Sequence, residues 1–156
     1  MALEDYFIAY GKQDRAAGEL VWQIDVPKLK PEESFRAYKI SKRFDQDISA
    51  VMAAFKFTLE GRRIVSARMA FGGMAATPKR ALLSEQALLG AALDEASSWS
   101  AAIAALASDY QPIADMRASA GYRMETAQAL LKKALMEVAQ GDSAATRVVG
   151  VRERAA

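Results

Sequence analysis

The amino-acid sequence predicts an α+β fold, in which an antiparallel sheet of three to four strands packs against a layer of three helices. Two neighbouring stretches, 51–59 and 65–71, alternate apolar and polar residues, as strands with one buried face do. Residues 121–139 instead repeat apolar residues every three or four positions, as an amphipathic helix does. Most strand patterns precede the helix patterns, so the sequence favours segregated strands and helices over alternating βαβ units.

The N-terminal part of the chain predicts one short helix and one strand. Leu3–Tyr10 places its apolar side chains on one helical face, which packs either on its own domain or against a partner. Glu19–Val26 is rich in strand-forming residues and ends at Pro27, which has no amide hydrogen to donate to a neighbouring strand. We therefore expect a strand here, with Trp22 in the core.

The central part of the chain predicts three further strands. Phe35–Arg43 is rich enough in strand formers to be extended, and the turn Glu60-Gly61-Arg62 joins the two alternating stretches as a hairpin. One hairpin face is expected in the core and the other facing water or a partner. The predicted core face comprises Val51, Ala53, Phe55, Phe57, Leu59, Val65, Ala67, Met69 and Phe71.

The remaining residues predict three helices. Thr77 is a good N-cap and Pro78 suits the first helical position, so a helix is expected to run to about residue 89. Ser97 or Ser98 is expected to cap a second helix, which carries the core residue Trp99.

A loop around Pro112 precedes the third helix, which we expect over about Gly121–Ala139 with Gly141 ending it. Residues 141–156 are small and charged, and are expected to form a flexible C-terminal tail. The seven methionines stand at helical or strand spacing and are expected in the core.

Composition excludes several classes of function. The 156 residues carry a net charge of +2, which argues against nucleic acid or a membrane as partner. Cysteine and histidine are absent from the sequence, which rules out disulfides, cysteine-ligated clusters and the commonest general base. The sequence also has no GxGxxG motif, no P-loop, no long apolar run and no export signal. We expect a cytoplasmic domain with no catalytic residue and no metal site.

Three stretches, in order along the chain, resemble one protein family. They are LEDYF with GELVWQIDVP (Leu3–Phe7 and Gly18–Pro27), FRAYKISKRFDQDISAV (Phe35–Val51), and FGGMAATPKRA, LLG and PIADMRASAGYRMETAQALL (Phe71–Ala81, Leu88–Gly90 and Pro112–Leu131). They resemble the C-terminal domain of the FAD-binding component (small subunit) of xanthine dehydrogenase, in the molybdenum hydroxylase flavoprotein family. The GGMA and DMRASAxYR motifs are the most specific part of this resemblance.

The resemblance implies a domain organisation and a set of partners. Residues 1–140 are expected to form a CO dehydrogenase flavoprotein C-terminal-like domain, in which 1–17 are a remnant of the connection from the FAD-binding domain. It implies FAD in the parent enzyme but not in this isolated chain, because the family's Gly-rich flavin loops lie upstream. The implied partners are the FAD-binding domain and the iron–sulfur and molybdopterin parts. A start at Met1, just before LEDYF, is typical of a truncated or separately encoded piece.

Lys39 is the residue for which the resemblance implies a cofactor contact, because it stands where the family places a lysine that reaches FAD. An ammonium near a reduced flavin stabilises the negative charge that develops there. The plainer interpretation is an ordinary strand lysine on a solvent-exposed face.

The segment after Lys39 carries a mixed cluster of charges, comprising Lys42, Arg43, Asp45 and Asp47. Its simplest interpretation is a solvated turn, whose ion pairs each contribute less than about 1 kcal/mol. The resemblance implies a sharper alternative, an interface near the flavin for Lys42, Arg43 and Asp45. Phe44 stands where some relatives carry an arginine, so switching behaviour tied to that arginine is not expected here.

The two specific motifs have mainly structural interpretations. Gly72-Gly73 is expected to provide a positive φ or a close approach, with a direct cofactor contact as the alternative. In the other motif, Asp115 is expected to accept hydrogen bonds from nearby amides and to pair with Arg117, while Tyr122 packs on the third helix.

Two functions remain open at this point. The first is a non-catalytic domain of a xanthine dehydrogenase flavin component, which supports FAD and subunit packing in electron transfer from the molybdenum centre to NAD. The second is a stand-alone interaction module with the same fold, a homodimer included, that works without flavin. An autonomous small enzyme is disfavoured, because the usual acid–base and nucleophilic residues are missing.

Overall fold

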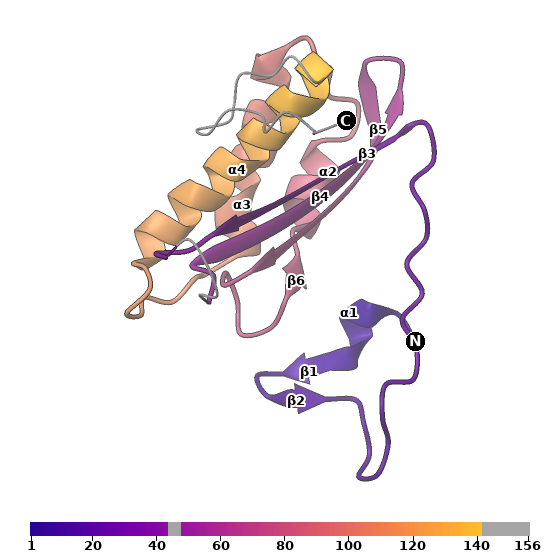
Figure 1. Cartoon of the computed structure of the whole chain (residues 1–156). Coiled ribbons are helices and arrows are strands. Elements are labelled where there is room, and N and C mark those ends of the chain that lie inside the picture. Colours follow the sequence, from indigo (N-terminus) through magenta and orange to yellow (C-terminus); the bar gives the residue numbers. More distant parts are fainter. Residues whose placement is uncertain (44–47, 142–156) are drawn as a thin grey trace, which may run out of the picture.

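The computed structural model describes residues 1–43 and 48–141 of the chain. Its main body is a four-stranded antiparallel sheet with the strand order β3-β4-β5-β6. The strands are β3 (Glu33–Ile40), β4 (Val51–Glu60), β5 (Arg63–Gly72) and β6 (Lys79–Arg80), and the main helices are α2 (Leu82–Ala87), α3 (Ser100–Asp109) and α4 (Ala120–Gln140). These helices lie together on one face of the sheet (Figure 1). The α+β prediction is therefore confirmed.

The hairpin of β4 and β5 holds the centre of the core. Gly61 takes a positive φ of 59° at the turn, a backbone conformation that a glycine adopts without strain. The rings of Phe55, Phe57 and Phe71 are all buried beneath the helices. Phe55 and Phe71 meet edge to face, with ring centroids 5.4 Å apart. Such pairs add about 0.5–1.5 kcal/mol to the stabilisation from burial alone.

The predicted core face of β5 is wrong at one position. A β-bulge shifts the register, so that Thr58 pairs with Ser66 while Leu59 pairs with Ile64. Val65 is the extra residue, and its side chain is 41% exposed, whereas Ile64 is fully buried. A bulge exchanges the two faces of a strand at that point, which simple alternation along the sequence does not reveal.

The helix predicted from Thr77 to about residue 89 begins later than expected. Thr77 and Pro78 do not start it, because the chain first forms β6, whose residues Lys79 and Arg80 pair with β5. Helix α2 then begins at Leu82, without a cap from a neighbouring residue. The carboxylate of Asp109 instead accepts hydrogen bonds from the amides of Leu83 and Ser84, at 3.0 and 2.9 Å. This cap comes from the end of α3, so no local sequence signal announces it.

The second helix differs from its prediction in how it starts. A 3-10 turn, Ala96–Trp99, precedes α3, and the hydroxyl of Ser98 bonds to the carbonyl of Ala92 at 3.0 Å rather than capping α3. Trp99 is buried as predicted, and its indole nitrogen also donates to that carbonyl, at 2.9 Å. A buried indole therefore fixes the start of α3.

The third helix is confirmed almost residue for residue. Helix α4 begins after Ser119, whose hydroxyl accepts a hydrogen bond from the amide of Tyr122 at 3.2 Å. It packs on the sheet through buried residues such as Leu131 and Leu135. Its Glu137 carboxylate accepts a 2.7 Å hydrogen bond from the hydroxyl of Tyr38, which ties the edge strand β3 to the helix layer. Beyond Gly141, the predicted tail lies outside the described residues.

The N-terminal predictions are largely wrong. The predicted helix Leu3–Tyr10 ends at Tyr6, and β1 (Phe7–Ala9) and β2 (Lys12–Gln13) form a separate two-stranded sheet around the turn at Gly11. The predicted strand Glu19–Val26 is extended but belongs to neither sheet. Trp22, expected in the core, is 89% exposed. Leu20 and Val26, on either side of Trp22, are likewise exposed, so nothing in residues 1–43 and 48–141 covers the apolar side chains of this stretch.

Methionines divide between the interior and the surface. Met69 and Met74 are buried as predicted, whereas Met52, on the outer face of the sheet, and Met116, in the loop before α4, are 48% and 86% exposed. Met1 is likewise exposed. The core prediction thus holds for Met69 and Met74 and in part for Met124 and Met136 of α4, which are half-buried against the core.

Candidate functional site

The sheet face opposite the helices carries Lys39. This lysine lies near the end of β3, where the register aligns it with Met52 on β4 and places Gly72 of β5 beyond Met52. Its side chain is exposed, and within the part of the chain that the structure describes its ammonium group makes no hydrogen bond or ion pair. Both sequence interpretations, a flavin contact and a solvent-exposed lysine, are compatible with this position.

The row beside Lys39 is built from small side chains. Ala37, Ala54 and Ala70 face one another across β3, β4 and β5. Because alanine side chains end at Cβ and Gly72 has none, this part of the outer face is flat and its backbone is closely approachable. The flat area formed by Ala37, Ala54, Ala70 and Gly72 is called the small-residue platform below.

On the other side of the platform from Lys39, the cationic side chains are paired with acidic residues. Lys56 and Arg68 form the next row, and both are engaged in ion pairs. Lys56 lies 2.7 Å from Glu33, and Arg68 lies 3.1 Å from Glu4 of α1 (Leu3–Tyr6). Lys39, Lys56 and Arg68 are the cations of the two rows on either side of the platform. Of these three, Lys39 is the one that has no acidic partner among the described residues.

The mixed charge cluster after β3 is only partly described. The ammonium of Lys42 donates a 2.7 Å hydrogen bond to the carbonyl of Met116, which joins this segment to the loop before α4. Arg43 is exposed, and its carbonyl accepts a hydrogen bond from the hydroxyl of Ser41. Phe44, Asp45 and Asp47 lie outside the described residues. The interface role of Lys42, Arg43 and Asp45 therefore stays a prediction.

Arg123 organises the sheet end next to Lys42. Its side chain is only 3% exposed, although it lies in the first turns of α4. One guanidinium nitrogen donates to the carbonyls of Ala50 and Gly73, the latter at 2.9 Å, and the other donates to Asp115 at 2.6 Å. A single side chain thereby connects the start of β4, the end of β5 and the loop before α4. The guanidinium fork suits this task because its donors are fixed in one plane.

Asp115 is held in its ionised form by several donors. The amide of Arg117 donates to it at 2.8 Å, the amide of Ala118 donates at 3.2 Å, and the guanidinium of Arg123 completes the set. These bonds, led by the one from the Arg117 amide, hold the pKa of Asp115 well below its ordinary value. The predicted amide contacts and the predicted pair with Arg117, at 2.9 Å, are both present.

Gly73 shows why the GGMA motif needs its second glycine. Its φ is +79°, and a Cβ at this position would collide with the Ala50 carbonyl and lie 2.9 Å from the guanidinium of Arg123. Both predicted reasons, a positive φ and a close approach, therefore apply at Gly73.

Arg123 is the central residue that the sequence analysis missed. A signal was present, because Arg123 stands four positions before the buried Ala127 and eight before Leu131, on the apolar face of the predicted helix. A lone arginine on such a face must be paired, since burying an unpaired charge is costly. By contrast, the predicted packing role of Tyr122 is weak, because its side chain is 49% exposed.

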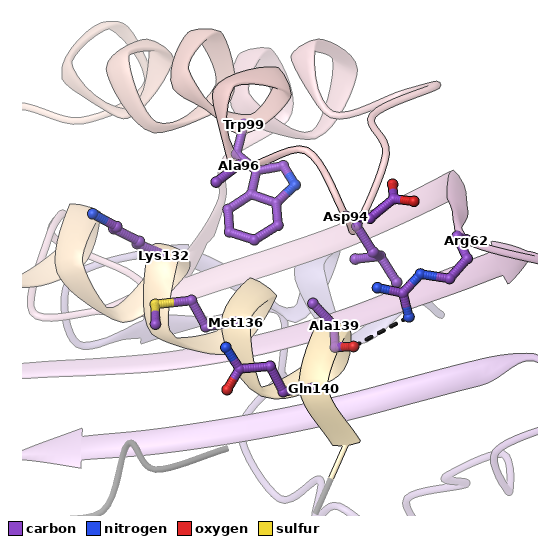
Figure 2. Close-up of a pocket in the computed structure, with 9 residues that line it drawn as sticks. Arg62, Asp94, Ala96, Trp99, Lys132, Met136, Ala139 and Gln140 are labelled. Atoms are coloured by element: carbon purple, nitrogen blue, oxygen red, sulfur yellow. Dashed lines mark hydrogen bonds between the residues drawn. The ribbon is translucent and has the colours of Figure 1, made fainter. Parts of the chain in front are cut away.

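Two shallow hollows lie at opposite ends of the fold. One of about 440 Å³ lies beside Lys42, Arg117 and Tyr122, at the same end as Lys39. The other, of about 390 Å³, lies between the start of α3 and the end of α4, near the β4–β5 turn. Figure 2 shows its apolar wall of Trp99 and Met136, and Arg62 donating to the carbonyl of Ala139 across its rim, at 3.1 Å. The first hollow is also lined by Ser41 and Ser119, whose hydroxyls bond to the Arg43 carbonyl and the Tyr122 amide.

Two further findings concern the described ranges 1–43 and 48–141. No helix there combines the length and the apolar character that crossing a membrane requires. No group of three or more acidic side chains there is placed to hold a metal ion.

Comparison with known proteins gives a consistent family. Residues 36–138 match the model of the CO dehydrogenase flavoprotein C-terminal domain. The glyceraldehyde dehydrogenase medium chain of Sulfolobus acidocaldarius is 32% identical over 135 residues, which are 86% of this chain and 47% of that protein. Xanthine dehydrogenase of Blastobotrys adeninivorans is 37% identical over 76 residues, which are 47% of this chain and 5% of that protein.

Solved structures give the same fold. A carbon monoxide dehydrogenase chain from Hydrogenophaga pseudoflava superimposes with a TM-score of 0.77 at 25% identity, over 85% of this chain and 45% of that one. Quinoline 2-oxidoreductase from Pseudomonas putida 86 gives a TM-score of 0.75 at 25% identity, over 88% and 47%. The fold is thus that of a domain found in oxidoreductases.

The chain belongs to the CO dehydrogenase flavoprotein C-terminal domain family, and so to the molybdenum hydroxylase flavoproteins. It spans less than half the length of the Sulfolobus medium chain and of both solved chains.

Proposed function

We propose that this chain is the C-terminal domain of the FAD-containing part of a molybdenum hydroxylase of the xanthine dehydrogenase type, where it supports the flavin and subunit packing and is not catalytic alone. The observation that carries this proposal is the ammonium of Lys39, which has no partner among the described residues and lies beside the small-residue platform, on a sheet face that the helices leave open. A free charge beside a flat surface suits a planar, electron-accepting ring.

The residues present fit a flavin ring but not a whole FAD. The small-residue platform offers a flat approach for a ring, and Lys39 offers a cation at its edge. The chain has no glycine-rich phosphate loop, so another part of the enzyme must hold the diphosphate. The chemistry that a bound FAD would supply in this proposal is electron transfer to NAD, with the electrons coming from the molybdenum centre through iron–sulfur clusters.

Lys39 would act through its positive charge, and not as an acid, a base or a nucleophile. A fixed ammonium lowers the free energy of a neighbouring group that gains negative charge, and the effect is larger where water is excluded. Its position on a strand keeps that charge in place, because the flanking residues of β3 are paired to β4. Arg123 would support the same end of the sheet by holding the Ala50 and Gly73 carbonyls.

The substrate of the parent enzyme is chosen elsewhere in this proposal. The relatives are named for glyceraldehyde, xanthine, nicotinate, carbon monoxide and quinoline, yet all share this domain. A domain common to such different reactions suits their shared electron-transfer part better than the substrate pocket.

The test is a Lys39→Ala substitution in the complete flavoprotein, with Lys56→Ala as the matched control on the same sheet face. We expect Lys39→Ala to lower the flavin's reduction potential and slow NAD reduction, because one neighbouring cation is lost. Lys56 is paired with Glu33, so its removal is expected to leave both unchanged. Equal flavin content, potential and NAD reduction in wild type and Lys39→Ala would reject the role.

A second candidate is a stand-alone interaction or dimerisation module without flavin. The open sheet face and the exposed N-terminal apolar residues favour it as much as they favour a flavoprotein domain. Sedimentation of the purified chain distinguishes the two. A stable dimer that gains no flavin when mixed with the FAD-binding part would support the module.

A further inference from the structure

Lys39 lies on a strand that is held from one side. β3 is an edge strand, and among the residues that the structure describes its strand neighbour is β4 alone. The amide of Leu59 donates to the carbonyl of Glu32 at 2.9 Å, so the backbone of Glu32 points at β4. Every second residue after it does the same, which includes Tyr38 and Ile40. The amide and carbonyl of Lys39 therefore point to the open edge, and its neighbours on the strand fix its position.

Two inner-face residues of β3 meet one carboxylate of the helix layer. The hydroxyl of Tyr38 donates to Glu137 of α4 at 2.7 Å, and Nε of Arg36 lies 3.3 Å from the same carboxylate. The Glu137 side chain is 16% exposed, so these contacts are partly shielded from water. The guanidinium of Arg36 also donates to the carbonyl of Phe35 on the open edge, at 2.9 Å. Arg36, Tyr38 and Glu137 are called the β3 clamp below.

The β3 clamp joins the edge strand to a rigid element. Burial raises the pKa of the Tyr38 hydroxyl, and its bond to Glu137 raises that pKa further, so the hydroxyl remains a donor at neutral pH. Lys133, one turn before Glu137, pairs with the same carboxylate at 3.0 Å and lies 5.6 Å from the centre of the Tyr38 ring. Helix α4 is itself fixed by the buried side chains of Leu131 and Leu135. Glu137 therefore offers β3 a fixed point on the side where the sheet ends.

We propose that Glu137 is a positioning residue for Lys39: by holding Tyr38 and the strand around it, Glu137 keeps the Lys39 ammonium at one place beside the small-residue platform. Tyr38 and Lys39 are adjacent on β3 but face opposite sides of the sheet, so the clamp itself lies away from the flavin face. A charge tunes a neighbouring cofactor only where the distance between them is fixed, since the Coulomb energy changes with that distance. The inference rests on the proposed function for the role of Lys39.

The test is a Tyr38→Phe substitution in the complete flavoprotein, because this change removes one hydroxyl group and no charge. The reduction of the flavin is measured at equilibrium with a reference dye in the absence of oxygen. We expect the equilibrium constant for flavin reduction to fall about threefold in Tyr38→Phe and about tenfold in Lys39→Ala, since the first displaces the ammonium and the second removes it.

Two further variants separate positioning from other effects. Glu137→Gln is expected to lower the same equilibrium constant, although the loss of a negative charge acting alone would raise it. Met136→Ala is the matched control on the same helix, because Met136 is half-buried and lines the hollow beside Trp99. We expect Met136→Ala to leave the equilibrium constant unchanged.

A double variant shows whether the clamp acts through Lys39. In the Lys39→Ala background, Tyr38→Phe is expected to have no further effect on flavin reduction, because no ammonium is left to position. A second measurement needs no flavin and follows amide hydrogen exchange in the 156-residue chain alone. The amides of Tyr38 and Ile40 should exchange about fivefold faster in Tyr38→Phe and less than about twofold faster in Met136→Ala, since an edge strand opens locally.

Three outcomes overturn the positioning role, and they differ in what they leave standing. If Tyr38→Phe reduces its flavin like the wild type while Lys39→Ala shows the expected fall, the positioning role fails and the proposed function stands. An equal fall for Tyr38→Phe with and without Lys39 also overturns the role, since the clamp would then act on the flavin by another route. If Lys39→Ala itself has no effect, the proposed function fails too, and faster exchange in Tyr38→Phe would leave the clamp a purely structural contact.

Discussion

The two faces of the same sheet differ in almost every property. On the inner face, Phe55 and Phe71 are sealed under the helix layer. On the outer face, Lys39 and Met52 are exposed beside a row of alanines. The inner face is a finished core, since its side chains interlock at the density of a protein interior. The outer face is flat beside Lys39, whose charge has no partner among the described residues, and in our proposal this face receives the flavin ring.

The contrast teaches which parts of the domain stand alone. The helices and the inner face pack on one another, and the two terminal guanidinium nitrogens of Arg123 are bonded within the chain, although its buried Nε has no hydrogen-bond partner among the described residues. The outer face is covered only by additional polypeptide or cofactor in our proposed function. Substitutions on the two sides should therefore report on different things, stability on one side and assembly on the other.

The largest effect is expected from Phe55→Ala on the inner face. Removing a buried ring that contacts Phe57 and Phe71 leaves a cavity and costs about 3–5 kcal/mol of the free energy of unfolding. Met52→Ala, on the same strand β4 but on its outer face, should cost less than about 1 kcal/mol. Urea unfolding of both variants checks this. Similar losses for the two would show that the outer face is packed within the chain.

The next effect concerns the buried arginine. Arg123→Met keeps the volume but leaves the Ala50 and Gly73 carbonyls and the Asp115 carboxylate without their donor, which should cost about 2–4 kcal/mol. Arg117→Ala removes an exposed partner of the same carboxylate and should cost less than about 1 kcal/mol. Thermal unfolding followed by circular dichroism compares them. If Arg117→Ala were the more damaging, Arg123 would not be the organising residue.

The sequence predicts those elements of the fold that are determined by residues close together in the chain, and it misses those that depend on distant residues. Alternation in 51–59 and the apolar repeat of α4 are local, and both elements were predicted. The cap of α2 by Asp109 crosses from another helix, so Thr77 was chosen wrongly. Glu19–Val26 fails for a different reason, since its pattern is that of a strand but none of the strands of the described residues pairs with it.

The candidate site was predicted less completely than the fold. Lys39 came from a family resemblance, and its exposure on β3 leaves the flavin contact a prediction. Asp115 and Arg117 were correctly paired from their spacing of two residues. Arg123 reaches residues 73 and 50 positions away in sequence, which spacing rules do not cover.

A smaller effect tests the β-bulge, which decides which face of β5 each residue joins. Ile64→Thr places a hydroxyl in the core and should cost about 1–3 kcal/mol, since Ile64 is fully buried. Val65→Thr should change the free energy of unfolding by no more than about 0.5 kcal/mol, because Val65 is 41% exposed. Chemical denaturation of this adjacent pair gives a direct answer. A larger loss for Val65→Thr than for Ile64→Thr would show that β5 alternates regularly and contains no bulge.

The smallest effect is a dependence of stability on pH that comes from Asp115. Its pKa is lowered in the folded state, so its contribution is complete above the ordinary aspartate pKa of about 4 and is lost as the pH falls below that value. Asp115→Asn should flatten this acid limb, as measured by melting temperature between pH 3 and pH 7, a range chosen on the order of the aspartate titration.

Arg117→Ala is the informative control for that measurement. The leading cause of the lowered pKa is the backbone amide of residue 117, which an alanine still carries. The acid limb should therefore persist in Arg117→Ala although an ion pair is lost. If the acid limb disappears in Arg117→Ala, the guanidinium of Arg117, and not the backbone amide, holds the carboxylate of Asp115 ionised. The loop before α4 would then depend on exposed charges, like the outer face, rather than on the buried network of the inner side.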